Sequence, residues 1–327
     1  MHHSVTQRLH ALAFAPVVAF QNLEMYPLVG PGPAAPGYAT LDEASARGAV
    51  TIKEVSSGGS VPTVQVLNDG DVPVLLLDGE ELLGAKQNRI VNLTILVPGH
   101  AALDVPVSCV EAGRWHHLSS AFSPAPRTQF AEARARKSAH VSASMREARG
   151  RMADQGEIWD GIAAKAERMH TVSATSAMSD IYDTYARSVE EFVDALAPVD
   201  GQVGAVFVID GRVRGVEVFD APATLATMLP KLVRSWALDA IETLGAKRRH
   251  RASAGADDPR SFVTTVAAAA AGEFKSLGLG TDIRFDGDGI AGGALVADDR
   301  VVHLTAFRLD APGSRVYRGR RGPQTIY

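Results

Sequence analysis

Polar side chains that could do chemistry gather between residues 78 and 115 of the 327-residue chain. They stand next to three strongly apolar runs, residues 74–77, 93–97 and 105–107. A half-exposed strand normally carries polar residues at every second position, whereas here they cluster at the ends of the runs. If the runs are neighbouring strands, one edge of a sheet collects six polar side chains: Glu80, Glu81, Lys86, Asn88, Arg89 and Glu111.

Such an edge would combine carboxylates with cations. Carboxylates can act as a general base or hold a divalent metal such as Mg²⁺; we expect this of Glu80, Glu81 and Glu111. Cations and amides can hold and orient a phosphate, and we expect this of five residues: Lys86, Gln87, Asn88, Arg89 and Arg114. An alternative stays open, in which the same charges only form ion pairs at a solvated hairpin tip.

A basic segment between residues 127 and 151 offers two more cations. It holds seven Lys or Arg and only two acids, and its composition favours a helix. At 100° per residue, Arg134 and Lys137 fall on the apolar stripe of that helix. A cation on a buried stripe must snorkel to solvent, pair with a carboxylate or meet an anionic ligand. We therefore include Arg134 and Lys137 as candidates that complete an anion site.

Cys109 is the only cysteine, which excludes an intramolecular disulfide and any multi-cysteine metal site. It could be a nucleophile beside Glu111 and His116, but its place after an apolar run favours an inert, buried thiol. His116 and His117 would point to opposite faces of a strand, so they are not expected to share a metal ion. Phosphate-binding loops, dinucleotide fingerprints, zinc-protease motifs and nucleophile elbows do not occur in the sequence.

The composition predicts a folded protein. Hydrophobic residues make up 46% of the chain and charged residues 21%, and the net charge is −4. This excludes intrinsic disorder and makes nucleic acid an unlikely partner, because no general excess of basic charge exists. The most apolar N-terminal stretch, residues 11–20, is too short to span a membrane and contains Pro16. We therefore expect a cytoplasmic protein with no membrane partner.

The elements that must position the polar residues change along the chain. Residues 10–125 are rich in β-branched residues, Gly and Pro, and contain five strand candidates, at 50–55, 61–67, 72–77, 89–97 and 103–110. Residues 126–200 favour helices near 127–151, 155–169 and 179–196. Residues 201–310 are typical of a hairpin, a helix and a second hairpin, and residues 311–327 form a basic tail.

Three apolar runs are each followed by an acidic turn and another run. The turns are Asp78-Gly79, Asp210-Gly211 and Asp298-Asp299. Asp-Gly supplies the positive φ angles of a tight turn, so each predicts a β-hairpin. We therefore predict an α+β fold of mainly antiparallel hairpins at both ends of the chain with a helical middle, forming one composite domain over residues 10–310.

Four runs of residues carry a resemblance to a known family. They are residues 77–89 (LDGEELLGAKQNR), 106–115 (PVSCVEAGRW), 154–156 with Trp159, and 178–182 (MSDIY). With these runs the chain resembles, from about Phe20 to Phe307, the bacterial family named for its association with ADP-ribosylglycohydrolases and rhodanese-phosphatases. The resemblance implies a neighbourhood of ADP-ribose and phosphate chemistry, which is an argument by association.

Three functional hypotheses follow. The first is an intracellular enzyme that binds or processes a phosphorylated nucleotide-type ligand, such as ADP-ribose or an NAD-derived product. The second is a non-catalytic sensor of the same anionic small molecule. The third is an interaction scaffold in a bacterial conflict or stress system, for which the charged residues are only a structural network.

Overall fold

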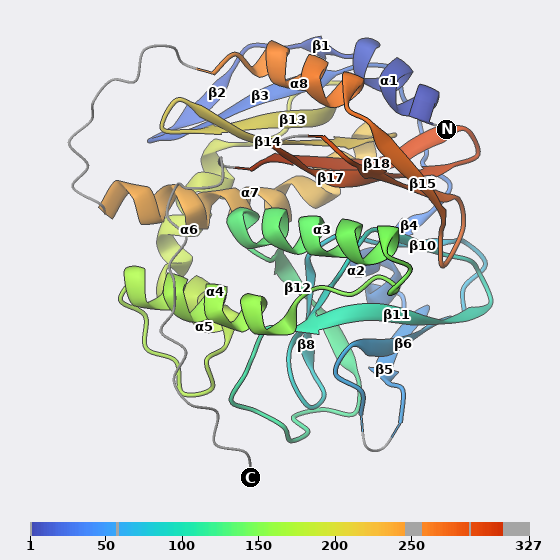
Figure 1. Ribbon diagram of the computed structural model, residues 1–327, viewed down its shortest axis with the longest axis vertical. Helices are drawn as coiled ribbons and strands as arrows, with labels where there is room; N and C mark the ends of the chain where they lie inside the picture. Colours follow the sequence, from blue (N-terminus) through green and yellow to red (C-terminus); the bar gives the residue numbers. More distant parts are fainter. Residues whose placement is uncertain (1, 57–58, 246–256, 288, 310–327) are drawn as a thin grey trace.

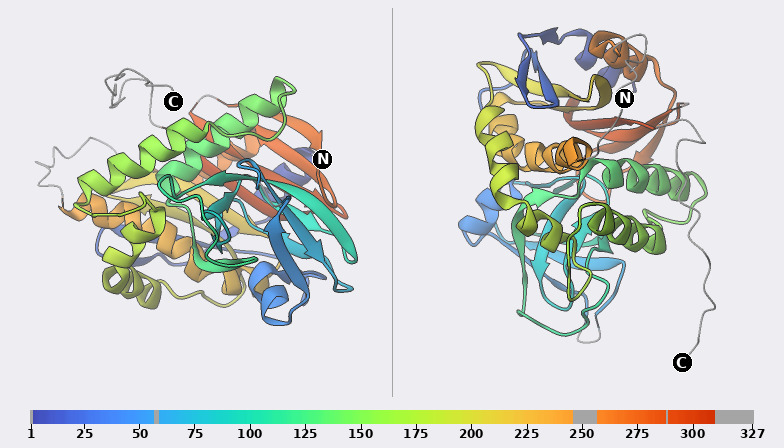
Figure 2. Two further views of the ribbon diagram at one scale, coloured as in Figure 1. Left: turned by 90° about the horizontal axis from the view of Figure 1, so that it is seen from below. Right: turned by 90° about the vertical axis from the view of Figure 1, so that its left-hand side faces the viewer.

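The computed structural model describes residues 2–56, 59–245, 257–287 and 289–309, and its elements form stacked layers (Figure 1). Helices α1 and α8 cover one face of a large antiparallel sheet, and α3 and α7 cover the other face. A β-barrel lies beyond α3 and α7, so these two helices are sandwiched between sheet and barrel (Figure 2). The helices are α1 (His2–His10), α2 (Leu41–Ala46), α3 (Ala131–Arg146), α4 (Gln155–Arg168), α5 (Met178–Thr184), α6 (Ala186–Ala195), α7 (Pro222–Gly245) and α8 (Pro259–Ala268).

The large sheet has nine strands within the described residues. Their order is β1-β3-β13-β14-β18-β17-β16-β15, and β2 pairs with β3. All of these pairings are antiparallel. The strands are β1 (Ala13–Phe14), β2 (Val18–Phe20), β3 (Leu23–Val29), β13 (Gln202–Ile209), β14 (Arg212–Phe219), β15 (Ala271–Lys275), β16 (Thr281–Phe285), β17 (Ile290–Ala297) and β18 (Arg300–Arg308).

The remaining strands form a closed barrel and a small three-stranded sheet. The barrel order is β11-β6-β5-β12-β8-β9, and the small sheet is β10-β7-β4, with one parallel pair between β4 and β7. The barrel strands are β5 (Val50–Glu54), β6 (Thr63–Asn68), β8 (Glu80–Gly84), β9 (Arg89–Val91), β11 (Ala101–Cys109) and β12 (Phe122–Thr128). The small sheet consists of β4 (Ala39–Thr40), β7 (Val74–Leu76) and β10 (Ile95–Val97).

The predicted α+β class is confirmed, and so are two of the three hairpins. Asp210 and Gly211 both have positive φ angles between β13 and β14, as do Asp298 and Asp299 between β17 and β18. Two consecutive positive φ angles are the requirement of a type I′ turn, whose twist matches that of the flanking strands.

The third predicted hairpin, at Asp78-Gly79, is wrong. Strand β7 pairs with β10 and β4, whereas β8 pairs with β9 and β12 in the barrel. Only Gly79 has a positive φ, and the Glu80 N–H donates to the Leu77 carbonyl, so the chain makes a type II turn. That turn sends the chain from the small sheet into the barrel.

The helical middle is as predicted in outline, and two predicted elements, one in it and one in the β-rich part, are each divided in the structure. The expected helix at 179–196 is divided at Tyr185 into α5 and α6. The strand expected at 89–97 is also divided, because residues 92–94 carry the chain out of the barrel into the small sheet. The predicted basic tail at 311–327 lies outside the described residues.

Close packing of the large sheet at Gly293 on β17 leads to the first prediction. A β-carbon there would lie 2.4 Å from the Ile283 carbonyl oxygen and 2.6 Å from Arg284 Nη1. Gly293→Ala should therefore lower the free energy of unfolding by roughly 1–3 kcal/mol, measured by urea denaturation.

Gly161→Ala is the matched control, because a β-carbon at this position inside α4 would meet no heavy atom within 4 Å. This change should raise the free energy of unfolding by about 0.5–1 kcal/mol, because alanine favours the helix. Equal effects of the two substitutions would contradict the packing described for β17.

Candidate functional site

The ten side chains that the sequence singles out are buried or half-buried, and they fall into four networks. Six of them meet at one end of the barrel. These six are Lys86, Gln87, Asn88, Arg89, Glu111 and Arg114. Together with their neighbours Glu54, Cys109 and Trp115 we call them the barrel-end cluster. Arg134 and Lys137 lie elsewhere, on α3 with Asp78, and Glu80 and Glu81 each belong to a separate ion pair.

Glu80 and Glu81 do not act together, because consecutive residues of a strand point to opposite faces. Glu80 Oε1 lies 2.5 Å from Lys231 Nζ, and Glu81 Oε2 lies 2.5 Å from Arg127 Nε. Burial raises the pKa of both carboxyl groups, and the paired cation opposes that rise in each case. Each carboxylate therefore has a cation of its own, and the two do not face a common ligand.

Arg89 is the centre of the barrel-end cluster. It lies opposite Cys109 in the β9–β11 ladder and is fully buried. Its Nη1 donates to Gln87 Oε1 at 2.8 Å and also to Cys109 Sγ. Nε and Nη2 make no hydrogen bond within the described residues. The nearest carboxylate, Glu54, lies 3.7 Å from Nη2, beyond hydrogen-bond distance.

Glu111 holds the cluster together. Its Oε2 lies 2.6 Å from Arg114 Nη2 and accepts from the Asn88 N–H, while Oε1 accepts from Thr175 Oγ1 at 2.9 Å. Burial alone would raise the pKa of Glu111, but the hydrogen bonds from Arg114, Thr175 and Asn88 lower it below its usual value. The carboxylate thus stays ionised near neutrality, which makes it an anchor for Arg114 and a weak general base.

Cys109 is the inert thiol that the sequence favoured. Its side chain is buried, and burial raises the pKa of the thiol to about 11 although Arg89 opposes the rise. A thiol with this pKa is protonated at neutral pH, whereas nucleophilic attack needs the thiolate.

Trp115 covers the cluster at the surface. Its side chain is 47% exposed, and Lys86 Nζ and Arg89 Cζ lie 5.4 Å and 5.5 Å from its ring centroid. The segment around it, residues 112–121, lies at the end of the barrel farthest from the large sheet (Figures 1 and 2). Sequence reasoning missed Trp115 as a site residue, although an aromatic residue directly after Arg114 was a usable signal. It also missed Glu54, for which no local signal exists.

Arg134 and Lys137 belong to a different place, between the sheet and the barrel. Arg134 is within 3.3 Å of Asp78 Oδ1 and 2.7 Å of Glu217 Oε1, and Lys137 Nζ is 3.2 Å from Asp78 Oδ2. Both cations are buried, so they pair with carboxylates and do not snorkel. Burial lowers the pKa of Lys137 to about 8.

A small cavity of about 10 Å³ lies beside these pairs, which we call the interlayer cavity. That volume is about the room that one water molecule needs. Six polar residues line it: Asp78, Thr94, Asp282, Arg284, His303 and Thr305. Sequence reasoning missed most of them, because a polar residue between apolar neighbours on a strand normally indicates the solvent face.

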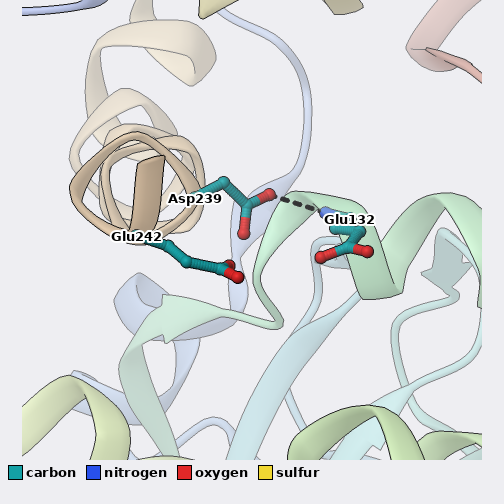
Figure 3. A group of neighbouring side chains, drawn as sticks. All are labelled: Glu132, Asp239 and Glu242. Carbon is teal, nitrogen blue, oxygen red and sulfur yellow. Dashed lines mark hydrogen bonds between the residues drawn. The ribbon is translucent and has the colours of Figure 1, made fainter. Parts of the chain in front are cut away.

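Glu132, Asp239 and Glu242 are the group of three potential metal ligands found among the described residues (Figure 3). Their carboxylates converge from α3 and α7, but Lys165 Nζ lies 2.7 Å from Asp239 and 2.6 Å from Glu242. Arg168 pairs with Glu242 as well. Lys165 and Arg168 together pair with all three carboxylates, so the group is explained as an ion-pair network.

No helix of the described residues combines the length and the apolar character needed to cross a membrane. In the comparison with protein families, residues 11–307 match the model described as the ARG and Rhodanese-Phosphatase-superfamily-associated Protein domain, where ARG denotes ADP-ribosylglycohydrolase. The comparisons with curated proteins and with solved structures found no match.

Asp282 on β16 gives a pH-dependent prediction. Burial raises its pKa from 3.8 to about 6, although Arg284 and Arg151 oppose the rise. The folded state therefore binds the Asp282 proton more tightly than the unfolded state, and the destabilisation from the ionised group disappears as the pH falls from about 6 towards 4. Relative to wild type, Asp282→Asn should become more stable by about 1 kcal/mol when the pH is raised from 5 to 7.

Urea denaturation at the two pH values measures this difference. Asp286→Asn, which changes an exposed carboxylate just beyond the same strand, is the control variant measured alongside. A stability difference between wild type and Asp282→Asn that is constant from pH 5 to pH 7 would refute the assignment.

Proposed function

The chain belongs to the family of ARG and Rhodanese-Phosphatase-superfamily-associated Protein domains, and from that premise we propose that it binds a phosphorylated nucleotide-type ligand at the barrel-end cluster. ADP-ribose and NAD-derived products are the ligands that the family name suggests, by association. The residues proposed to contact the ligand are Lys86, Gln87, Arg89 and Trp115.

The free edge of Arg89 is the observation that carries this proposal. The Nε–H and Nη2–H groups point from the same edge of the guanidinium, and neither donates to an acceptor among the described residues. Leaving buried donors unsatisfied costs free energy, so this edge favours an incoming acceptor. Two parallel N–H donors match the two oxygens of a phosphate or carboxylate.

Trp115 and Lys86 suggest how the rest of a nucleotide would be held. An exposed indole can stack on a planar base, and such stacking contributes about 1–3 kcal/mol per base in nucleic-acid complexes. Lys86 and Arg89 lie close to the same ring, so a phosphate near the ring edge would meet two cations. Binding would require Trp115 to move, because Arg89 is fully buried behind it.

The charges of the cluster also favour an anion. Lys86, Arg89 and Arg114 supply three positive charges, while Glu54 and Glu111 supply two negative ones. The excess is one positive charge in a largely buried setting, where electrostatic attraction is less screened than at the surface.

The same cluster supports binding better than turnover. Its thiol is protonated, and Glu111 is an ionised carboxylate with a lowered pKa whose oxygens are engaged by Arg114, Asn88 and Thr175. A general base works best when its pKa lies near the operating pH. We therefore propose the ligand sensor ahead of the enzyme for this site, with Glu111 as a supporting residue, whereas Glu80 and Glu81 lie outside the cluster in their own ion pairs.

Calorimetric titration with ADP-ribose, NAD and AMP, with and without Mg²⁺, tests the proposal. Arg89→Lys keeps the positive charge but loses the two parallel N–H donors, and it should weaken binding about tenfold or more. Trp115→Ala should weaken binding by a similar factor, because the stacking surface is lost. Arg187→Lys, on the exposed face of α6, is the control and should bind as wild type.

The proposal fails if the wild-type protein binds none of these ligands, or if Arg89→Lys binds as tightly as wild type. A tight protein partner recovered from cell extracts, together with no response to any nucleotide, would favour the interaction scaffold.

A further inference from the structure

We propose that the interlayer cavity is a second chemical site, in which Thr94, His303 and Glu217 form a hydroxyl–imidazole–carboxylate relay and Thr94 Oγ1 is a nucleophile towards small neutral acyl esters. The site is separate from the barrel-end cluster and does not depend on nucleotide binding there. None of its three relay residues stood out in the sequence.

The distances form a continuous chain of hydrogen bonds. Thr94 Oγ1 lies 2.8 Å from His303 Nδ1, and His303 Nε2 lies 3.0 Å from Glu217 Oε2. All three side chains are buried. A nucleophile bonded to a base, and a base oriented by a third group, is the geometry that activates a hydroxyl group.

The neighbours of the relay fix where its protons lie. Glu217 already accepts a hydrogen bond from Arg134 and, as a carboxylate, has none to donate, so His303 Nε2 must carry the proton between them. In the neutral tautomer with its proton on Nε2, Nδ1 is an acceptor and the Thr94 hydroxyl donates to it, which is the arrangement that the proposal requires. The Asp78 N–H donates to Thr94 Oγ1 at 3.1 Å, which holds the hydroxyl in this orientation.

Thr305 and Arg284 both bring hydrogen-bond donors to the lining of the same cavity. Thr305 Oγ1 makes no hydrogen bond within the described residues although its side chain is buried. Arg284 donates through Nε to Ser142 and through Nη2 to Ser138, and its Nη1 lies next to Gly293, another residue of the cavity lining. In a site that served packing alone, such donors would only have to be satisfied by other groups. In a catalytic site they would donate to the oxyanion that develops beside Thr94.

The charge balance points to a neutral substrate. Around the cavity the buried cations are Arg134, Lys137 and Arg284, and the buried carboxylates are Asp78, Glu217 and Asp282. These six charges cancel, and Arg151, which pairs with Asp282, adds one positive charge. A phosphate would still meet two carboxylates of the lining, Asp78 and Asp282. An uncharged acyl ester avoids repulsion by these two carboxylates.

The reaction is a two-step acyl transfer. Thr94 Oγ1 attacks the carbonyl carbon and its proton passes to His303 Nδ1, while Arg284 and Thr305 hold the oxyanion. The ester C–O bond then breaks, and the departing alkoxide takes the proton from His303, which leaves an acyl group on Thr94. A water molecule attacks this acyl group through the same base, and the products are a carboxylic acid and free Thr94.

Access sets the size of the acyl group. Thr94 lies in the segment between β9 and β10, whereas His303, Thr305 and Arg284 lie in the large sheet. The walls therefore belong to different layers, and an acyl group enters the one-water cavity only when the layers separate locally. The smallest suitable probe is an acetyl ester.

The test uses the full chain with p-nitrophenyl acetate, stopped-flow detection of p-nitrophenol, and peptide mass mapping. We expect one acetyl group on Thr94, lost in Thr94→Val and retained in Thr94→Ser. His303→Gln should slow acetylation of Thr94 about 100-fold or more. Thr128→Val, a buried threonine outside the cavity lining, should react as wild type.

Surface lysines that become acetylated in the same sample show that the reagent is active. The proposal is overturned if Thr94 stays unmodified while those lysines react and wild type releases p-nitrophenol no faster than His303→Gln. It is equally overturned if Thr94 is acetylated at the same rate in His303→Gln as in wild type. Because Thr94→Ser and His303→Gln keep polar groups of similar size, the test does not depend on folding of Thr94→Val.

Discussion

The pairing of buried charges with opposite charges determines how the layers of this protein are arranged. Arg134 on α3 bridges Asp78, at the entrance to the barrel, and Glu217 in the large sheet, and all three side chains are buried. Each ion gives up several kcal/mol of hydration, so removal of any one of them would leave an uncompensated charge in the layer. These ion pairs therefore fix how barrel, helix and sheet are placed relative to one another.

The same requirement separates residues that are adjacent in sequence. Glu80 and Glu81 are neighbours, but strand alternation turns them towards Lys231 and Arg127 on different elements. At the far end of the barrel, compensation is incomplete. Other arginines of the described chain leave at most one buried nitrogen without a hydrogen-bond partner, whereas Arg89 leaves two on one edge. The binding proposal is centred on this edge for that reason.

The sequence predicted the α+β class, the two hairpins at Asp210-Gly211 and Asp298-Asp299, and the helical middle, since these depend on local turn chemistry and composition. Of the ten side chains that it singled out, six lie together at the barrel end, whereas Glu80, Glu81, Arg134 and Lys137 lie elsewhere. It could not predict that the turn at Asp78-Gly79 is of type II and leads out of the small sheet, or that Glu54 and His303 join sites from distant strands. Those features depend on strand order and on long-range charge pairing, which no local pattern encodes.

The central claim is that the free edge of Arg89 receives a phosphate group. The most direct measurement is an NMR titration that follows the Nε–H resonances of ¹⁵N-labelled arginine side chains as ADP-ribose is added, with Arg89 assigned from Arg89→Lys. The account predicts a large, saturable shift of the Arg89 Nε–H signal, with smaller changes at Arg134 and Arg284. A signal of Arg89 that stays fixed while the ligand binds elsewhere on the protein would contradict it.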